Sequence, residues 1–405
     1  MVKLPATVGS AEYGGPVFTN PGGPGGSGVG DILRSGKVYQ NMTGNQFDII
    51  GFDPRGVNMT TPGFSAFETA EERLAFFQDQ ITDVNSTTDA LPLARARYQS
   101  YGQAAQSSNV SNFMSTADVA LDMLAMMNAL GQDKLQYYGI SYGSYLGQVF
   151  ATMFPDRVGH IVIDGVIDSE AYLTNDWGTL TQDMDKVMQA FFDSCHSAGP
   201  ELCPFYASTP SEIAAKLDSI YDSLRAQSLP VVSGGTVAVF TYDKLRASIW
   251  GSTTNAFTGF PIIAGTLAQL LQGNVTGVSE LREYMSSVNS SFAGVATGFR
   301  TECAGWKIHP ESRFKGPVGA NTSFPILLVG NTADGRTSFE GAKKTNAKFP
   351  GSALLTLDAP GHTALIAASS SCISQHVAAY FSNGTLPEEG TVCQPDMQLF
   401  GSSPA

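Results

Sequence analysis

At residues 137–143 the sequence reads Tyr137-Tyr138-Gly139-Ile140-Ser141-Tyr142-Gly143, which contains a Gly-x-Ser-x-Gly motif. An apolar run at 135–138 precedes the motif, and a helical pattern over 144–154 follows it. On a sharp turn between a strand and a helix a serine is exposed, and the free N–H groups of the helix N-terminus attract negative charge. Gly139 and Gly143 permit the close backbone approach that this turn requires. The motif in this setting predicts that Ser141 is a nucleophile.

Outside the motif, short apolar runs alternate with helical patterns, which is typical of a parallel sheet covered by helices on both faces. Each run is almost continuously apolar, as expected for strands buried on both faces. Ser115 and Asp118 have the spacing of a capping box and predict the start of a helix. Strands are predicted at 16–19, 47–52, 135–138, 160–163, 324–330 and 352–357, with a last helix at 371–381. The fold class predicted is α/β with a mostly parallel central sheet.

The strand rhythm stops between residues 169 and 322. This segment has only helical patterns, at 180–194, 210–227, 242–249 and 261–271. We therefore expect a helical cap inserted into the α/β core. The predicted domains are the N-terminal core part at 1–168, the cap at 169–322 and the C-terminal core part at 323–405.

Composition limits the partners of this chain. Its 405 residues are 42% hydrophobic, which is enough for one large domain or two smaller ones. The net charge of −13, without a basic run, would repel a phosphate backbone, so no nucleic-acid partner is expected. No run approaches the ~20 apolar residues of a membrane helix, so no membrane partner is expected either. The sequence gives no indication of the oligomeric state.

A serine hydroxyl is a weak nucleophile and needs an imidazole to take its proton and an acid to orient that imidazole. Of the five histidines, His362 follows the predicted strand at 352–357 in a loop, whereas His376 lies within a predicted helix. Asp334 follows the strand at 324–330 in a turn and is the expected acid. Asp358 is the rival, but its place at a strand end favours a solvated or turn-capping role.

Two backbone N–H groups are needed to hold the negative charge that develops on a carbonyl oxygen. Tyr142, directly after the predicted nucleophile, offers the first. The second is expected from the Gly-rich loop at 20–28, where Gly23 is favoured and Gly22 and Gly25 are alternatives. Pro24 has no N–H. No Gly-Lys-Ser/Thr follows this loop and no zinc-like cysteine spacing occurs, so neither a cofactor nor a metal is predicted.

The Gly-rich loop, the Gly-x-Ser-x-Gly motif and two further motifs resemble the proline iminopeptidase and tripeptidyl aminopeptidase-like branch of the α/β-hydrolases. The further motifs are Gly51-Phe52-Asp53-Pro54-Arg55-Gly56 and Phe154-Pro155-Asp156-Arg157-Val158. The resemblance implies a serine hydrolase that works through an acyl-enzyme and removes N-terminal residues or short peptides from peptide substrates. The alternative is an esterase, lactonase or other acyl hydrolase, because the same triad serves any acyl group. A non-catalytic binding protein of this fold would lack a triad member, and none is missing here.

One departure from the family lies at the acid turn. The family usually has Asp-Pro-Val-Thr-Pro there, whereas this chain has Asp334-Gly335-Arg336-Thr337-Ser338. Family exopeptidases hold the substrate's free amine with carboxylates of the cap. By that resemblance Glu302 and then Asp168 are the substrate-binding candidates, with Glu170 and Asp176 behind them, and solvated surface acids are the alternative interpretation. Arg55 is expected to clamp its loop rather than to take part in catalysis.

Cysteines and glycosylation sequons bear on where the protein resides. Cys195 and Cys203 are close in sequence, as are Cys372 and Cys393, but several pairings are formally open and Cys303 is left over. The family resemblance favours the Cys372–Cys393 pair. Eight Asn-x-Ser/Thr sequons indicate a secreted glycoprotein, at Asn41, Asn58, Asn85, Asn109, Asn274, Asn289, Asn321 and Asn383. The first residues lack a signal-peptide pattern, and we expect the natural chain to begin upstream.

Overall fold

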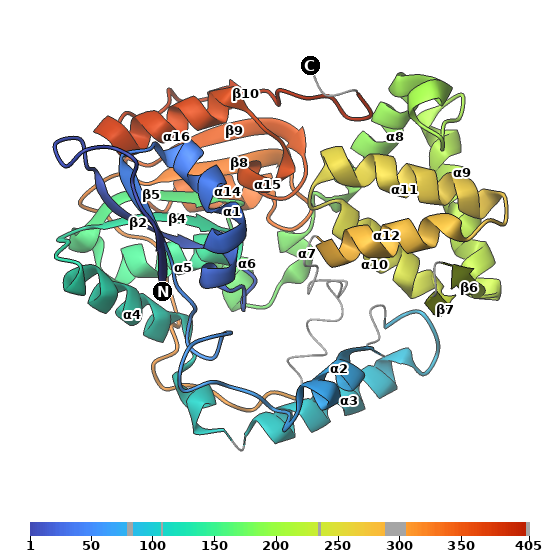
Figure 1. Ribbon diagram of the computed structural model, residues 1–405, viewed down its shortest axis with the longest axis horizontal. Coiled ribbons are helices and arrows are strands. Elements are labelled where there is room, and N and C mark those ends of the chain that lie inside the picture. The colour runs from blue at the N-terminus through green and yellow to red at the C-terminus, as the bar shows by residue number, and fades with distance from the viewer. Residues whose placement is uncertain (79–83, 107, 234–235, 288–304, 402–405) are drawn as a thin grey trace.

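A computed structural model describes residues 1–78, 84–106, 108–233, 236–287 and 305–401 (Figure 1). Within these residues a central sheet has the strand order β1-β3-β2-β4-β5-β8-β9-β10. Only β1 at one edge pairs in the antiparallel sense, with β3, and the other neighbours in this sheet are parallel. The strands are β1 (Val2–Leu4), β2 (Gly15–Asn20), β3 (Phe47–Gly51), β4 (Leu135–Ile140), β5 (Val158–Asp164), β8 (Leu327–Ala333), β9 (Ala353–Pro360) and β10 (Val392–Cys393). The α/β class and the six predicted core strands are confirmed.

Helices cover both faces of this sheet (Figure 1). On one face α1 (Gly28–Thr43) and α16 (Ser371–Asn383) pack against each other and against an apolar layer of the sheet. On the other face lie α4 (Thr116–Ala129), α5 (Tyr142–Met153) and α14 (Phe339–Asn346). The Ser115 and Asp118 capping box at the start of α4 is present as predicted.

The segment between β5 and β8 forms a second group of elements beside the sheet (Figure 1). It contains α6 (Ser169–Leu173), α7 (Trp177–Leu180), α8 (Met184–Leu202), α9 (Pro210–Ala226), β6 (Leu229–Ser233), β7 (Thr236–Phe240), α10 (Tyr242–Ser252), α11 (Ala256–Leu271) and α12 (Thr276–Ser287). Its elements from α8 onward enclose a second apolar core. We call this segment the cap. The expected helical cap is present, and it also contains a feature that was not predicted, the antiparallel hairpin of β6 and β7. Val232, Val237 and Val239 of the hairpin are exposed, so the hairpin lacks the burial on both faces that is typical of the strands of the central sheet.

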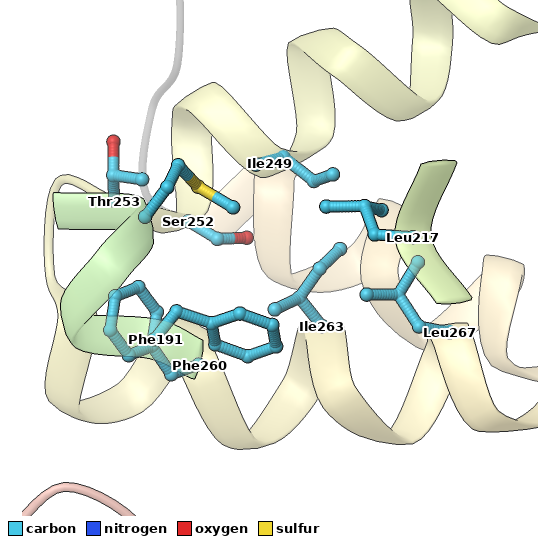
Figure 2. Close-up of a pocket in the computed structure, with 9 residues that line it drawn as sticks. Phe191, Leu217, Ile249, Ser252, Thr253, Phe260, Ile263 and Leu267 are labelled. Atoms are coloured by element: carbon cyan, nitrogen blue, oxygen red, sulfur yellow. The ribbon is translucent and has the colours of Figure 1, made fainter. Parts of the chain in front are cut away.

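Figure 2 shows the interior of the cap, where Phe191 of α8 and Phe260 of α11 pack edge to face with ring centroids 5.1 Å apart. Ile263 and Leu267 lie beside them. The void among these side chains measures about 10 Å³, which leaves room for about one water molecule. This part of the cap is a packed core and not a ligand site.

An excursion between β3 and α4 was not predicted. It carries α2 (Ala70–Gln78) and α3 (Ala90–Ala105), which lie apart from the sheet (Figure 1). Aromatic rings hold it together: Phe76 stacks on Tyr101 at 5.7 Å, and Tyr101 lies 6.4 Å from Trp306. The remaining short helices are η1 (Asn109–Phe113), η2 (Pro155–Arg157) and α15 (Ala364–Ala367).

Two disulfides are formed, Cys195–Cys203 in the cap and Cys372–Cys393 between α16 and β10. Both predicted pairs are thus present, and Cys303 lies outside the described residues. Seven of the eight sequon asparagines are described and all seven are exposed. Among the helices described, none has both the length and the apolar character needed to cross a bilayer.

Candidate active site

Ser141 sits on the turn between β4 and α5, with φ 57° and ψ −121°. A non-glycine residue in this region of backbone space is strained, and such strain persists where the surroundings hold it. Its amide donates to the Asp164 carbonyl oxygen at 2.9 Å. A Cβ on Gly143 would lie 2.5 Å from the Asn20 carbonyl oxygen, so only glycine fits there. The strand, turn and helix predicted around Ser141 are confirmed.

The parallel sheet brings the predicted acid and base together, since β8 and β9 are neighbours and both end at the same edge. Asp334 follows β8 and is fully buried, and His362 follows β9 and is 6% exposed. His362 Nδ1 lies 2.9 Å from Asp334 Oδ2 and 3.0 Å from Oδ1. The two residues predicted from separate strand ends therefore form a buried pair.

Backbone and hydroxyl donors fix the Asp334 carboxylate. The amides of Arg336 and Thr337 donate to Oδ1, while Thr337 Oγ1 at 2.8 Å and the Thr363 amide donate to Oδ2. Burial alone would raise the pKa of Asp334, but His362 and these hydrogen bonds lower it below its ordinary value. Asp334 is therefore held ionised, which is the state that orients an imidazole.

The alternative acid and the alternative histidine, Asp358 and His376, are not part of this pair. Asp358 is exposed and accepts from Thr332 and Gln394 rather than from His362, as its expected turn role implied. His376 lies within α16, away from the Asp334 pair.

The Gly-rich loop after β2 lies against the turn that carries Ser141. A Cβ on Gly22 would come within 2.8 Å of Ser141 Cβ and 3.0 Å of the Tyr142 nitrogen, and Gly22 has φ 86°. The Gly22 amide donates to Asn20 Oδ1 at 2.9 Å, so it is already engaged. Of the two remaining candidates, Gly23 lines the cavity described below and Gly25 does not, so Gly23 stays the predicted donor.

Side chains of the second motif brace this loop. Asp53 accepts from Ser27 Oγ at 2.7 Å and from the Val29 amide at 3.1 Å, and it also accepts from Asn58 Nδ2. Arg55 forms a two-point ion pair with Asp122 of α4, at 2.7 Å for both nitrogens. Arg55 is thus a structural clamp, as predicted. Asn58 donates to Asp53 through the side-chain nitrogen that glycosylation would modify, so a glycan there would disturb this contact.

A cavity of about 280 Å³ joins these parts. Both Ser141 and His362 line it, at the carboxyl ends of the parallel strands, where α/β sheets usually bind ligands. Its lining residues are Pro21, Gly22, Gly23, Gly26, Ser27, Asp31, Arg34, Ile140, Ser141, Ile167, Tyr172, Trp177, Leu180, Thr181, Trp250, Thr254, Arg336, Thr337, His362 and Ile366.

The two substrate-binding candidates are not among these residues. Asp168 is 3% exposed, caps α6 by accepting from the Glu170 and Ala171 amides, and lies 3.4 Å from Lys344. Glu302 lies outside the described residues. Among the described lining residues the carboxylate is that of Asp31, on the first turn of α1. Sequence reasoning missed Asp31, because nothing local distinguishes it from an ordinary helix-start acid.

Asp164 was also missed. Its carbonyl accepts from the Ser141 amide, and its carboxylate accepts from the amides of Ala364 at 2.7 Å and Leu365 at 2.8 Å. Tyr138 also donates to it, at 3.2 Å. Asp164 thus joins the turn that carries Ser141 to the segment directly after His362.

Comparison with known proteins agrees with this geometry. A family model described as an alpha/beta hydrolase fold matches residues 15–200, and one described as a TAP-like protein matches residues 290–393. Tripeptidyl aminopeptidase of Streptomyces lividans is 25% identical over 429 residues, covering 95% of this chain and 78% of that protein. Serine protease Hip1 of Mycobacterium tuberculosis is 26% identical over 455 residues, covering 97% and 83%. Carboxylesterase B of M. tuberculosis is 25% identical over 445 residues, covering 98% and 82%. The chain is therefore a serine hydrolase with the α/β-hydrolase fold, and it is similar to TAP-like proteins.

Proposed function

We propose that this chain is a serine exopeptidase of the aminopeptidase type, which removes N-terminal residues or short peptides. The observation that carries the proposal is the shared cavity: Ser141 on its strained turn and the buried His362–Asp334 pair open into one space. The relatives named tripeptidyl aminopeptidase and serine protease support a peptide substrate.

In this proposal His362 takes the proton of Ser141 Oγ while that oxygen attacks the substrate carbonyl, and Asp334 holds the imidazole in place. The amides of Tyr142 and Gly23 donate to the oxyanion. His362 then gives the proton to the departing amine, which leaves an acyl-enzyme on Ser141. Water, deprotonated by His362, hydrolyses the ester and frees Ser141.

Asp31 is the described residue best suited to bind the free N-terminus of the substrate. It lines the cavity, and its buried Oδ2 makes no hydrogen bond of good geometry within the described part of the chain, although the hydroxyls of Tyr39 and Ser35 lie near the carboxylate. Burial raises its pKa, so a bound ammonium group would stabilise the ionised carboxylate. Glu302 remains the alternative carboxylate that the resemblance implies.

The test is a matched panel of free-amine di- and tripeptide amides, their N-acetylated forms and simple acyl esters, assayed with wild type and Ser141→Ala. We expect turnover of the free-amine peptides, loss on N-acetylation and loss in Ser141→Ala. In Asp31→Asn the preference for free amines over N-acetyl peptides should fall about tenfold. Equal turnover of acetylated peptides would exclude an exo-aminopeptidase.

A carboxylic ester hydrolase is the second candidate, favoured by the similarity to carboxylesterase B and by the aromatic walls that Tyr172, Trp177 and Trp250 give the cavity. Turnover of the esters alone in the same panel would establish it.

The exposed sequons and the two disulfides support the further proposal of a secreted glycoprotein. Expression through a eukaryotic secretory route should give a protein whose mass falls on treatment with an N-glycosidase. An unchanged mass would refute the glycosylation.

A further inference from the structure

Arg336 occupies the turn in which this chain departs from its family, two residues after Asp334. Its side chain lines the catalytic cavity beside Trp250 of the cap. Arg336 Nη2 donates to the Trp250 carbonyl oxygen at 2.8 Å, and the guanidinium carbon lies 5.1 Å from the Trp250 ring centroid. The guanidinium is thus held at the contact between core and cap, next to the reacting groups.

Two hydrogen-bond donors at this contact between core and cap lack an acceptor among the described residues. Arg336 Nε and Trp250 Nε1 are both buried, and neither has an acceptor within the described residues. A buried donor without an acceptor destabilises the folded protein. Both belong to residues that line the same cavity, so a ligand in that cavity is the natural source of the missing acceptors.

The positive charge of Arg336 is also uncompensated by an ion pair in the part of the chain that is described. Burial lowers its pKa to about 10, against the attraction of Asp334, so the guanidinium is charged at neutral pH. Asp334 is already engaged by His362 and by backbone amides. The other cavity-lining arginine, Arg34, differs because it is exposed and is attracted to Asp31 on its own helix.

We propose that Arg336 and Trp250 bind a carboxylate of the substrate and make the enzyme selective for substrates that carry one near the scissile carbonyl. A carboxylate has two acceptor oxygens, which would accept from Arg336 Nε and Trp250 Nε1. Its negative charge would pair with the Arg336 guanidinium. The carboxylate belongs either to an acidic side chain of the acyl residue or to the free C-terminus of a short leaving peptide. The proposal rests on hydrolysis at Ser141, but not on the peptide specificity proposed above.

The experiment compares kcat/KM within three matched pairs. Glutamyl against glutaminyl 4-nitroanilide tests an acidic acyl residue, and trialanine against trialanine amide tests the C-terminus. 4-Nitrophenyl hydrogen adipate against 4-nitrophenyl hexanoate tests an acid on a non-peptide acyl group. Taking the ratio within a pair cancels any general loss of activity in a variant.

In wild type we expect at least one ratio to favour the carboxylate more than tenfold. Arg336→Gln should bring that ratio close to one, Arg336→Lys should retain part of it, and Arg34→Gln should leave it at the wild-type value. Ratios near one in all wild-type pairs, a ratio that survives in Arg336→Gln, or an equal collapse in Arg34→Gln would overturn the proposal. The adipate pair separates this result from the proposed peptidase activity, because esters test Arg336 even if no peptide is cleaved.

A binding measurement does not depend on turnover. Glutarate should bind the Ser141→Ala protein at least tenfold more tightly than the Ser141→Ala, Arg336→Gln protein in isothermal titration calorimetry, with thermal melting used to show that both are folded. Equal affinity for glutarate in the two proteins would contradict the role of Arg336.

Discussion

At the residue scale, the surroundings of Asp334 keep its carboxylate ionised and place it against the imidazole of His362. Replacing Asp334 with Asn keeps the shape of the side chain. The amide nitrogen, however, donates a hydrogen bond to His362 Nδ1, whereas the carboxylate oxygen accepts one. We expect Asp334→Asn to lower kcat by about 10³–10⁴-fold with little change in KM, as for a triad whose imidazole is held in the wrong tautomer. Steady-state kinetics on the best substrate measures this.

Thr337 provides the matched smaller change. Its hydroxyl donates to Asp334 Oδ2 at 2.8 Å and lies 3.4 Å from His362 Nδ1. Thr337→Val keeps the shape and removes one hydrogen bond, so kcat should fall about tenfold. Unchanged kcat in both variants would show that Asp334 does not orient the base.

Asp164 predicts a pH dependence of stability. Burial raises its pKa to about 6, although the Ala364 and Leu365 amides oppose this rise. Since the folded pKa lies above the unfolded value of about 4, the contribution of Asp164 to stability is complete below pH 4 and is lost as pH rises through 6. Two pKa units correspond to about 3 kcal/mol.

The variant Asp164→Asn does not titrate, so it isolates this effect. The unfolding free energy of wild type minus that of Asp164→Asn should fall by about 3 kcal/mol between pH 4 and pH 7. Urea unfolding at several pH values measures the difference. A difference that does not vary with pH would mean that Asp164 does not titrate in this range.

The residues that the sequence could identify are those marked by a local pattern or by scarcity. Ser141 stands in a motif between a strand and a helix, and His362 is one of five histidines, of which few follow a late strand. Asp31, Asp164 and Arg336 have no such mark. They become informative only through burial and missing or converging hydrogen bonds, which depend on distant segments.

At the element scale, the same distinction explains which strands were predicted. Strands of the parallel sheet are buried on both faces, so an uninterrupted apolar run marks them. The hairpin of β6 and β7 exposes Val232, Val237 and Val239. The face that α3 buries consists mostly of small residues, which give only a weak hydrophobic signal: Ala90, Ala94, Tyr98, Gly102 and Ala105. Such elements have weak periodicity, and the sequence alone does not reveal them.

The α2–α3 excursion leads to a prediction about its attachment. Gly102 of α3 and Gly305 approach so closely that a Cβ on Gly102 would collide with the Gly305 carbonyl oxygen. We therefore expect Gly102→Ala to destabilise the protein by about 1–3 kcal/mol. Chemical unfolding measures the change.

The matched control is Gly265→Ala in α11, where a Cβ would meet nothing within 4 Å. That change should be neutral or should stabilise the helix by up to about 1 kcal/mol. If Gly102→Ala were equally well tolerated, α3 and the Gly305 segment would not be packed as described.

At the scale of the whole molecule, most of the cap, from α8 onward, has an apolar interior of its own. Ala171 and Leu180 of the cap pack into one apolar cluster of the sheet and Phe257 into the other, and the C-terminal segment adds a further connection. After β10 the chain leaves the sheet and runs to the cap (Figure 1). There Phe400 is 4% exposed, with its ring centroid 6.0 Å from Phe191 and 6.5 Å from Phe260. Phe400, which follows the last strand of the sheet in sequence, is thus part of the apolar interior of the cap.

This arrangement predicts that Phe400→Ala acts on the cap rather than on the sheet. Removing a buried phenylalanine costs about 3–5 kcal/mol, and the loss falls on the apolar cluster that contains Phe191 and Phe260. Hydrogen exchange should therefore become faster in α8 and α11, while β4 and β5 keep their protection.

The same variant should also lower turnover. Trp250 and Thr254 of the cap line the catalytic cavity, and the Thr254 carbonyl accepts from the His362 amide at 2.9 Å. Phe113→Ala, at a ring that is 58% exposed, is the control and should change neither. Faster exchange spread equally over sheet and cap would show that the two interiors unfold as one unit.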